Sequence, residues 1–354
     1  MPTFIVGTGR CGSTMLSNML REHPSILSIS ECYSHIIDYG GRIEQVFARK
    51  PLEGRDFWNL ISAITPRESL LLRHDLAIPE VLYAYRSSHS RFSKETGVPA
   101  ILHVTLPHLT AKCDELFEEM DKEVTCWPPL TIRQHYDRLF DWLRQRFNKK
   151  IWIERSGGTF VIIEQLFAAF PDARFIHLVR DGRAASRSMA NHLAFRLFIV
   201  AELLTDLLNV DPYEDSDRSR VGKLTPEMLK FLPESFDAQA FEEYRPSLQI
   251  WGEFWSKLII KGINILKKLP RRRVLTLRYE DFFTAPRENL HKLAEFLGPE
   301  YMDPIWEEEA VQVIRHPRFS CTGLTKEDEA LLQAACRPGF EALRSMGVVY
   351  DMLI

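Results

Sequence analysis

The sequence has no run of 18 or more apolar residues, so no segment has the length and character of a membrane-spanning helix. The chain opens on a short apolar segment and lacks the basic start and apolar core of a secretion signal. From these two absences we expect a cytoplasmic protein without a stable membrane anchor.

An excess of charge of one sign is also missing. The 45 Lys and Arg residues nearly balance the 48 Asp and Glu residues, which leaves a formal net charge of −3. Proteins that bind nucleic acid or an anionic membrane over a broad face carry a marked basic excess. We therefore expect no nucleic-acid partner, and any site for an anion must be built locally.

Cysteine is sparse and shows no functional spacing. The six cysteines form no C-x-x-C pair and no Cys/His spacing typical of a metal site. We expect reduced thiols and no metal ion. The chain also lacks internal repeats and low-complexity tracts.

What the sequence does contain is the composition of a soluble globular protein, with 45% hydrophobic and 26% charged residues among 354. A chain of this length can bury a large core. Short apolar segments that resemble buried strands occur at 4–6, 26–30, 151–154, 175–179 and 274–278. We expect one α/β domain over residues 1–354.

The most informative stretch runs from Phe4 to Leu16. Its first three residues read as a buried strand, and its three glycines allow a tight turn into a helix that begins at Ser13. A strand, a glycine-rich loop and a helix N-terminus together favour a bound anion, because unpaired amides and the helix dipole point at the same place. Arg10 adds a guanidinium suited to phosphate or sulfate oxygens.

This loop is not a standard nucleotide-binding P-loop. No Lys precedes Ser13, and no matching strand ends in an acidic magnesium ligand. The loop resembles instead the 5′-phosphosulfate loop of sulfotransferases that use 3′-phosphoadenosine 5′-phosphosulfate, in the branch with Arg in the loop, which includes many bacterial and the tyrosylprotein enzymes. The resemblance implies donor contacts from Gly9, Arg10, Cys11, Gly12, Ser13 and Thr14. The alternatives are a glycine-rich turn without a ligand and a Cys11 that only packs beneath it.

Glu31 follows the first helix, a His-Pro pair and the second strand segment. In the resembling family this position carries a Glu that acts as catalytic base. A solvated loop carboxylate or a helix cap is the alternative.

Arg155 ends the third strand segment, where the family has a Lys that bridges the transferred group and the leaving phosphate. Cytosolic relatives place a catalytic His two residues later, where this chain has Gly157. The base must then come from elsewhere, and Glu31 is the candidate. Arg155 as a simple salt-bridge residue stays open.

The sequence Val179-Arg180-Asp181-Gly182-Arg183 matches a second family motif, with Ser188 eight residues after its first Arg. The resemblance implies that Arg180 and Ser188 hold the 3′-phosphate of the donor. Tyr279, after the last strand segment, matches a residue near the adenine. His192 departs from the tyrosylprotein enzymes, which have a further Arg there.

Other regions are less informative. Residues 33–150 read as a mainly helical insertion over the edge of the sheet where an acceptor would enter. Within it, 98–107 has strand character, and His103 resembles a catalytic His only superficially, so we interpret it as structural. Residues 241–269 predict one long helix. Residues 315–320 are the nearest basic substitute for the loop that closes over the 3′-phosphate in cytosolic relatives.

The resemblance implies a P-loop-like parallel sheet flanked by helices, and a sulfuryl transfer from 3′-phosphoadenosine 5′-phosphosulfate to an acceptor hydroxyl, with 3′,5′-adenosine bisphosphate as product. Glu31, Arg10 and Arg155 would be its catalytic residues. A catalytically impaired donor-binding protein, or a P-loop kinase, is the alternative. The acceptor can be a lipid, a sugar, a peptide or a carrier-bound hydroxyacyl group, and the oligomeric state stays open.

Overall fold

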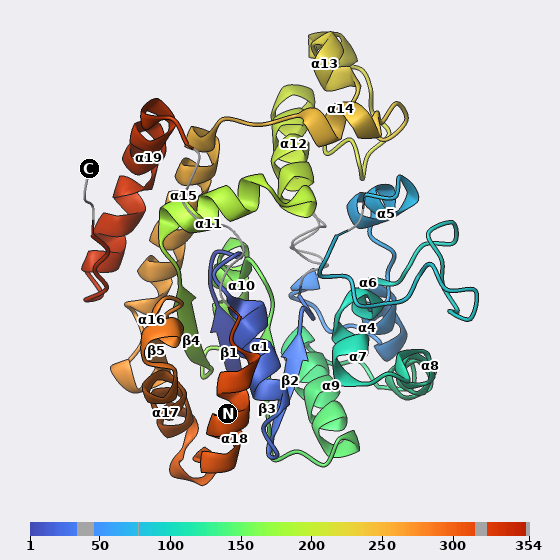
Figure 1. The fold of residues 1–354 in the computed structure, drawn as a ribbon. Helices are drawn as coiled ribbons and strands as arrows, with labels where there is room; N and C mark the ends of the chain where they lie inside the picture. The colour runs from blue at the N-terminus through green and yellow to red at the C-terminus, as the bar shows by residue number, and fades with distance from the viewer. Residues whose placement is uncertain (34–45, 77, 316–323, 352–354) are drawn as a thin grey trace.

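The computed structural model describes residues 1–33, 46–76, 78–315 and 324–351 (Figure 1). At its centre lies a five-stranded sheet in the order β2-β3-β1-β4-β5, in which all neighbouring strands are parallel. The strands are β1 (Thr3–Val6), β2 (Ile26–Ser30), β3 (Ile151–Arg155), β4 (Arg174–Val179) and β5 (Val274–Arg278). The predicted α/β class with a parallel sheet is confirmed.

Helices flank the sheet and occupy the connections between its strands. Within the described residues they are α1 (Ser13–Arg21), α4 (Gly54–Ile61), α5 (Pro66–Arg73), α6 (Ala100–His103), α7 (Thr105–Leu109), α8 (Cys113–Val124), α9 (Ile132–Arg146), α10 (Ile163–Ala169), α11 (Gly182–Ala190), α12 (Leu193–Leu208), α13 (Pro226–Leu229), α14 (Ala238–Glu243), α15 (Leu248–Leu266), α16 (Asp281–Thr284), α17 (Pro286–Leu297), α18 (Pro304–Val313) and α19 (Lys326–Arg344). None of these helices has both the length and the apolar character needed to cross a membrane.

The central strand β1 carries a different hydrophobic core on each face, because successive side chains of a strand point to opposite sides. Ile5 packs with residues of α1, α17 and α18, whereas Phe4 and Val6 pack with residues of α9, α10 and α15. Coverage of both faces explains why all four residues of β1 are buried apolar or β-branched side chains.

The chain between β2 and β3 is helical in its described part. Helices α4, α6, α7 and α8 lie on the side of the edge strand β2 (Figure 1), α7 and α9 contact that strand, and α5 packs against α12. This arrangement leaves the carboxyl ends of the strands open to the segments that connect these helices, and in open parallel sheets ligands bind at that end.

Two sequence predictions are wrong. Residues 98–107 form the short helices α6 and α7 in place of a strand, because Pro99 starts a helical turn whose apolar residues are buried on more than one side. The single helix expected over 241–269 is two helices, α14 and α15, because the backbone before Pro246 is restricted and Ser247 starts the second helix as its cap.

Candidate functional site

The loop after β1 is shaped by three left-handed positions within four residues. Gly9 has φ +79°, Arg10 has φ +51° and Gly12 has φ +90°. A Cβ atom at Gly12 would lie 2.0 Å from the ring of Tyr279, so only glycine permits this approach. The loop therefore turns back against the end of β5 before α1 begins, and Gly12 caps that helix without a side-chain hydrogen bond.

Arg180 connects this loop to the residue after β5. Its guanidinium carbon lies 4.8 Å from the centroid of the Tyr279 ring, a cation–π contact. The same guanidinium donates a hydrogen bond of 3.1 Å to the carbonyl oxygen of Arg10. Residues that follow β1, β4 and β5 thus meet at one point, as their positions at the ends of parallel strands predict.

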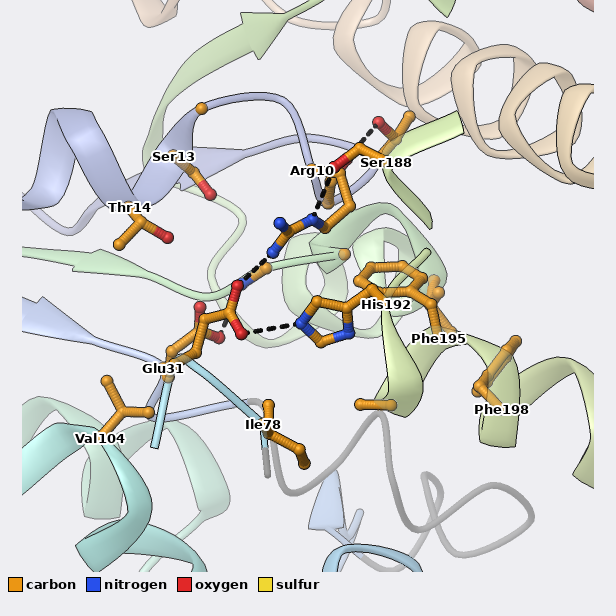
Figure 2. Close-up of a pocket in the computed structure, with 18 of the residues that line it drawn as sticks. Arg10, Ser13, Thr14, Glu31, Ile78, Val104, Ser188, His192, Phe195 and Phe198 are labelled. Atoms are coloured by element: carbon orange, nitrogen blue, oxygen red, sulfur yellow. Dashed lines mark hydrogen bonds and ion pairs between the residues drawn. The ribbon is translucent and has the colours of Figure 1, made fainter. Parts of the chain in front are cut away.

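Arg10 reaches across the site to Ser188 and Glu80. Its Nε donates to the hydroxyl of Ser188 at 3.1 Å, and its Nη1 forms an ion pair with Glu80. The other oxygen of Glu80 lies 2.8 Å from Nε2 of His192. Figure 2 shows Arg10, Ser188 and His192 on the same side of the cavity. Burial alone would raise the pKa of Glu80, but the hydrogen bond and charge of His192, together with Arg10, outweigh it and lower the pKa to about 2. The carboxylate is therefore ionised at every working pH.

Glu31 is held in a strained and specific position. It has φ +58°, which is uncommon for a residue with a side chain and typical of functional sites. Its carboxylate forms an ion pair with Arg155 and accepts a hydrogen bond of 2.8 Å from the backbone N–H of Gly157. A Cβ atom at Gly157 would lie 3.3 Å from Glu31, so a larger residue there would crowd the carboxylate.

Arg155 lies behind Glu31 and is only 1% exposed. Besides Glu31, it donates a hydrogen bond of 2.7 Å to the hydroxyl of Ser30. Its guanidinium is not among the groups that line the cavity described below, so its charge reaches the site through Glu31.

The neighbouring Glu154 is fully buried beside Ser156. Burial is the main cause that raises its pKa, to about 8, and the charge of Glu31 adds to it. The native state therefore holds a proton that the unfolded chain, in which a glutamate has its ordinary pKa of 4.5, releases at lower pH. The contribution of Glu154 to stability is complete at low pH and declines as the pH rises toward 8.

We expect Glu154→Gln to remove this dependence, because the amide fits the same space and cannot ionise. The unfolding free energy of the variant relative to the parent should rise by a few kcal/mol between pH 5 and pH 8. Urea unfolding at both pH values measures the difference. Parallel pH profiles for the two proteins would show that Glu154 is not the titrating group.

A cavity of about 410 Å³ opens where these residues meet. The predicted site residues that line it are Gly9, Arg10, Gly12, Ser13, Thr14, Glu31, Arg180, Ser188 and Tyr279. Cys11 is absent from this lining. Its side chain is 2% exposed and burial raises the pKa of its thiol, in agreement with the interpretation that it packs beneath the loop.

The helical region before β3 supplies the opposite wall, and sequence reasoning, which expected an insertion over this edge, did not identify the side chains that it contributes. Glu68 and Glu80 both line the cavity, and Glu68 forms an ion pair with Nδ1 of His103, which also lines it. Glu80 follows no motif, and it lies in an irregular segment between α5 and α6. His103, interpreted from the sequence as structural, is buried at the cavity wall.

Two further histidines of the sequence, His177 and His35, are alternatives to Glu31 as the base. His177 is fully buried in β4, where burial lowers its pKa to about 3, and it is not among the lining residues. The alternative base His35, and residues 316–320 of the basic segment, lie outside the described residues. Arg315 is described, and its guanidinium bonds to carbonyls of its own helix end.

Comparison with known proteins identifies two overlapping matches. A family sequence profile described as the sulfotransferase family matches residues 2–214, more than half of the chain. A second profile, described as a sulfotransferase domain, matches residues 163–330. No curated protein matches the sequence.

The chain is also similar to three solved structures of sulfotransferases. The sulfotransferase domain from the curacin biosynthetic pathway is 18% identical, with 92% of this chain and 81% of that chain covered and a TM-score of 0.43. The sulfotransferase domain from the Synechococcus PCC 7002 olefin synthase is 15% identical, with 99% and 95% covered and a TM-score of 0.44. Sulfotransferase STF9 from Mycobacterium avium is 16% identical, with 99% and 77% covered and a TM-score of 0.42.

Proposed function

The chain belongs to the sulfotransferase family, and we propose that it moves a sulfuryl group from 3′-phosphoadenosine 5′-phosphosulfate to an acceptor hydroxyl with Glu31 as general base. One observation carries this proposal. A loop suited to an anion that carries Arg10, a second arginine, Arg180, and the fixed carboxylate of Glu31 come from the ends of three different strands and line a single cavity.

The donor side of the cavity fits an anionic nucleotide. The start of α1, which no side chain caps, and the hydroxyls of Ser13 and Thr14 would hold the phosphosulfate, because the first turn of a helix and its dipole favour negative charge there. Arg180 and Ser188 would hold the 3′-phosphate, and Tyr279 would lie on the adenine side.

Sulfuryl transfer by in-line displacement needs positioning and charge stabilisation more than covalent help from the protein, as phosphoryl transfer does. Glu31 takes the proton of the acceptor hydroxyl as its oxygen bonds to sulfur. The bond from sulfur to the bridging oxygen breaks, and 3′,5′-adenosine bisphosphate leaves. Arg10 meets the charge that develops on the leaving side.

Arg155 serves in this proposal as a positioning residue. It is buried and holds the Glu31 carboxylate from behind, together with the N–H of Gly157. A direct contact between Arg155 and the leaving group, which the family resemblance implies, stays a prediction.

The donor assignment is tested by ligand-induced stabilisation. We expect 3′,5′-adenosine bisphosphate to raise the melting temperature by several degrees more than 5′-AMP at the same concentration, because only the former engages Arg180 and Ser188 through its 3′-phosphate. Arg180→Ala should narrow this difference without changing the response to 5′-AMP.

Arg183→Ala is the matched control. Arg183 follows Arg180 by three residues, is paired with Asp181 and does not line the cavity. Its loss should leave unchanged the difference in stabilisation between the two nucleotides. Equal stabilisation of the parent protein by both nucleotides would remove the donor assignment.

A further inference from the structure

From the hydrocarbon wall of the cavity we propose that the acceptor is an uncharged, largely hydrocarbon alcohol, bound with its hydroxyl toward Glu31. This inference rests on the proposed function, because the donor loop defines which side of the cavity is left for the acceptor. In Figure 2, Ile78, Val104 and Phe198 lie on the side of the cavity away from Ser13 and Thr14.

An aromatic pair forms one part of this wall. Phe198 of α12 and Phe254 of α15 both line the cavity, and their ring centroids are 5.5 Å apart. Both rings are only half-buried, although each belongs to a helix that packs in the core. Half-buried phenylalanine rings that face a cavity form an apolar binding surface, because covering them with a hydrocarbon removes apolar area from water and lowers the free energy.

The apolar wall extends to the donor loop. Phe195 of α12 lies so close to Gly9 that a Cβ atom on that glycine would be 2.5 Å from the ring. A hydrocarbon chain bound along the phenylalanines would therefore end beside the loop. Val104 and Ile78 of the opposite segments lie near Glu31 in the same view (Figure 2).

The polar groups of this side are already engaged with one another. Glu31 is paired with Arg155, Glu68 with His103, and Glu80 with Arg10 and His192. A sugar would lose its hydrogen bonds to water on entering the cavity, and the polar side chains there already bond to one another. Its hydroxyls would then lack partners, and this loss of hydrogen bonds weakens binding. An anionic acceptor would meet three carboxylates. Both considerations favour an uncharged hydrocarbon.

The experiment measures kcat/KM with labelled donor for straight-chain primary alcohols from butanol to octanol, with glucose and a tyrosine-containing peptide beside them. We expect kcat/KM to rise about two- to fourfold for each added methylene, because each buried methylene contributes to binding. A series that does not depend on chain length, or a preference for glucose or the peptide, overturns the inference.

Variants locate the effect on the wall. Phe198→Asn should reduce kcat/KM for octanol about tenfold and change the value for butanol little. Val104→Thr keeps the side-chain volume and replaces a methyl group with a hydroxyl, and it should reduce kcat/KM for octanol several-fold. This second variant tests the wall if Phe198→Asn folds poorly. The control is Leu207→Asn, because Leu207 lies on the same helix, is 39% exposed and is not a lining residue.

Calorimetric binding of the same alcohols in the presence of 3′,5′-adenosine bisphosphate separates this inference from the proposed function. Affinity that rises with chain length without any sulfuryl transfer would support the apolar site and contradict the function. Transfer that is independent of chain length would support the function and contradict the apolar acceptor. Alcohols that neither bind nor react would overturn the inference.

Discussion

Glu31→Gln is expected to lower the rate of sulfuryl transfer by about 10²-fold or more and to leave the binding of 3′,5′-adenosine bisphosphate unchanged. The amide keeps the shape of the carboxylate and its contact with the N–H of Gly157, but it cannot take a proton. Single-turnover transfer to an accepted alcohol, with donor saturating, measures the chemical step without the binding step.

The stability of this variant needs its own measurement. Arg155 is almost fully buried, and its charge is compensated by Glu31. Removing one partner of a buried ion pair leaves the other charge uncompensated, which commonly costs about 3–5 kcal/mol. We therefore expect Glu31→Gln to melt at a lower temperature than the parent, and the rates must be compared well below both transitions.

Glu68→Gln is the informative comparison, because Glu68 is a second carboxylate on the same cavity and is paired with His103. A large loss in Glu31→Gln and a small one in Glu68→Gln would support Glu31 as the base. The reverse order would move the base to the Glu68–His103 pair. Bound donor product with no transfer in the parent protein would favour a catalytically impaired donor-binding protein.

The residues that sequence alone could place share one property. Arg10, Glu31, Arg180 and Tyr279 each come within a few residues of the end of a strand, and parallel strands bring their carboxyl ends to one edge whatever the details of packing. The strand pattern together with the family resemblance therefore predicted that these four residues lie at the cavity, whereas Cys11 and Arg155, which were predicted with them, do not line it. The roles of all these residues stay predictions until tested.

The opposite wall could not be placed in this way. Glu80, Val104 and Phe198 reach the cavity because helices far apart in the sequence pack beside the sheet, and nothing in their local sequence records that packing. The error at 98–107 has a similar origin, since a short apolar run does not distinguish a strand from a buried helical turn. The error at Pro246 was avoidable, because the residue that interrupts the helix is visible in the sequence.

Arg10→Ala is expected to weaken binding of 3′,5′-adenosine bisphosphate and to lower the transfer rate, with a combined loss of about 10²–10³-fold in kcat/KM for the donor. Arg10 lies on the loop that would hold the phosphosulfate, and its guanidinium lines the cavity and pairs with Glu80. An arginine that meets charge developing on the leaving oxygen contributes to binding and more strongly to the transition state, so both parameters should change. This separates Arg10→Ala from Glu31→Gln, in which the transfer rate changes and the binding of 3′,5′-adenosine bisphosphate does not.

Glu80→Gln should act in the opposite direction on binding. Its carboxylate forms an ion pair with Arg10 and therefore competes with the phosphate of the nucleotide for the same guanidinium. Neutralising it should tighten binding of 3′,5′-adenosine bisphosphate several-fold, and this gain should vanish in the Arg10→Ala background. Titration calorimetry on the parent, the two single variants and the double variant measures this coupling. Weaker binding in both single variants would mean that Glu80 holds Arg10 in its productive position. Unchanged binding and turnover in Arg10→Ala would contradict a role for Arg10 and leave Arg180 as the arginine that meets the charge of the donor.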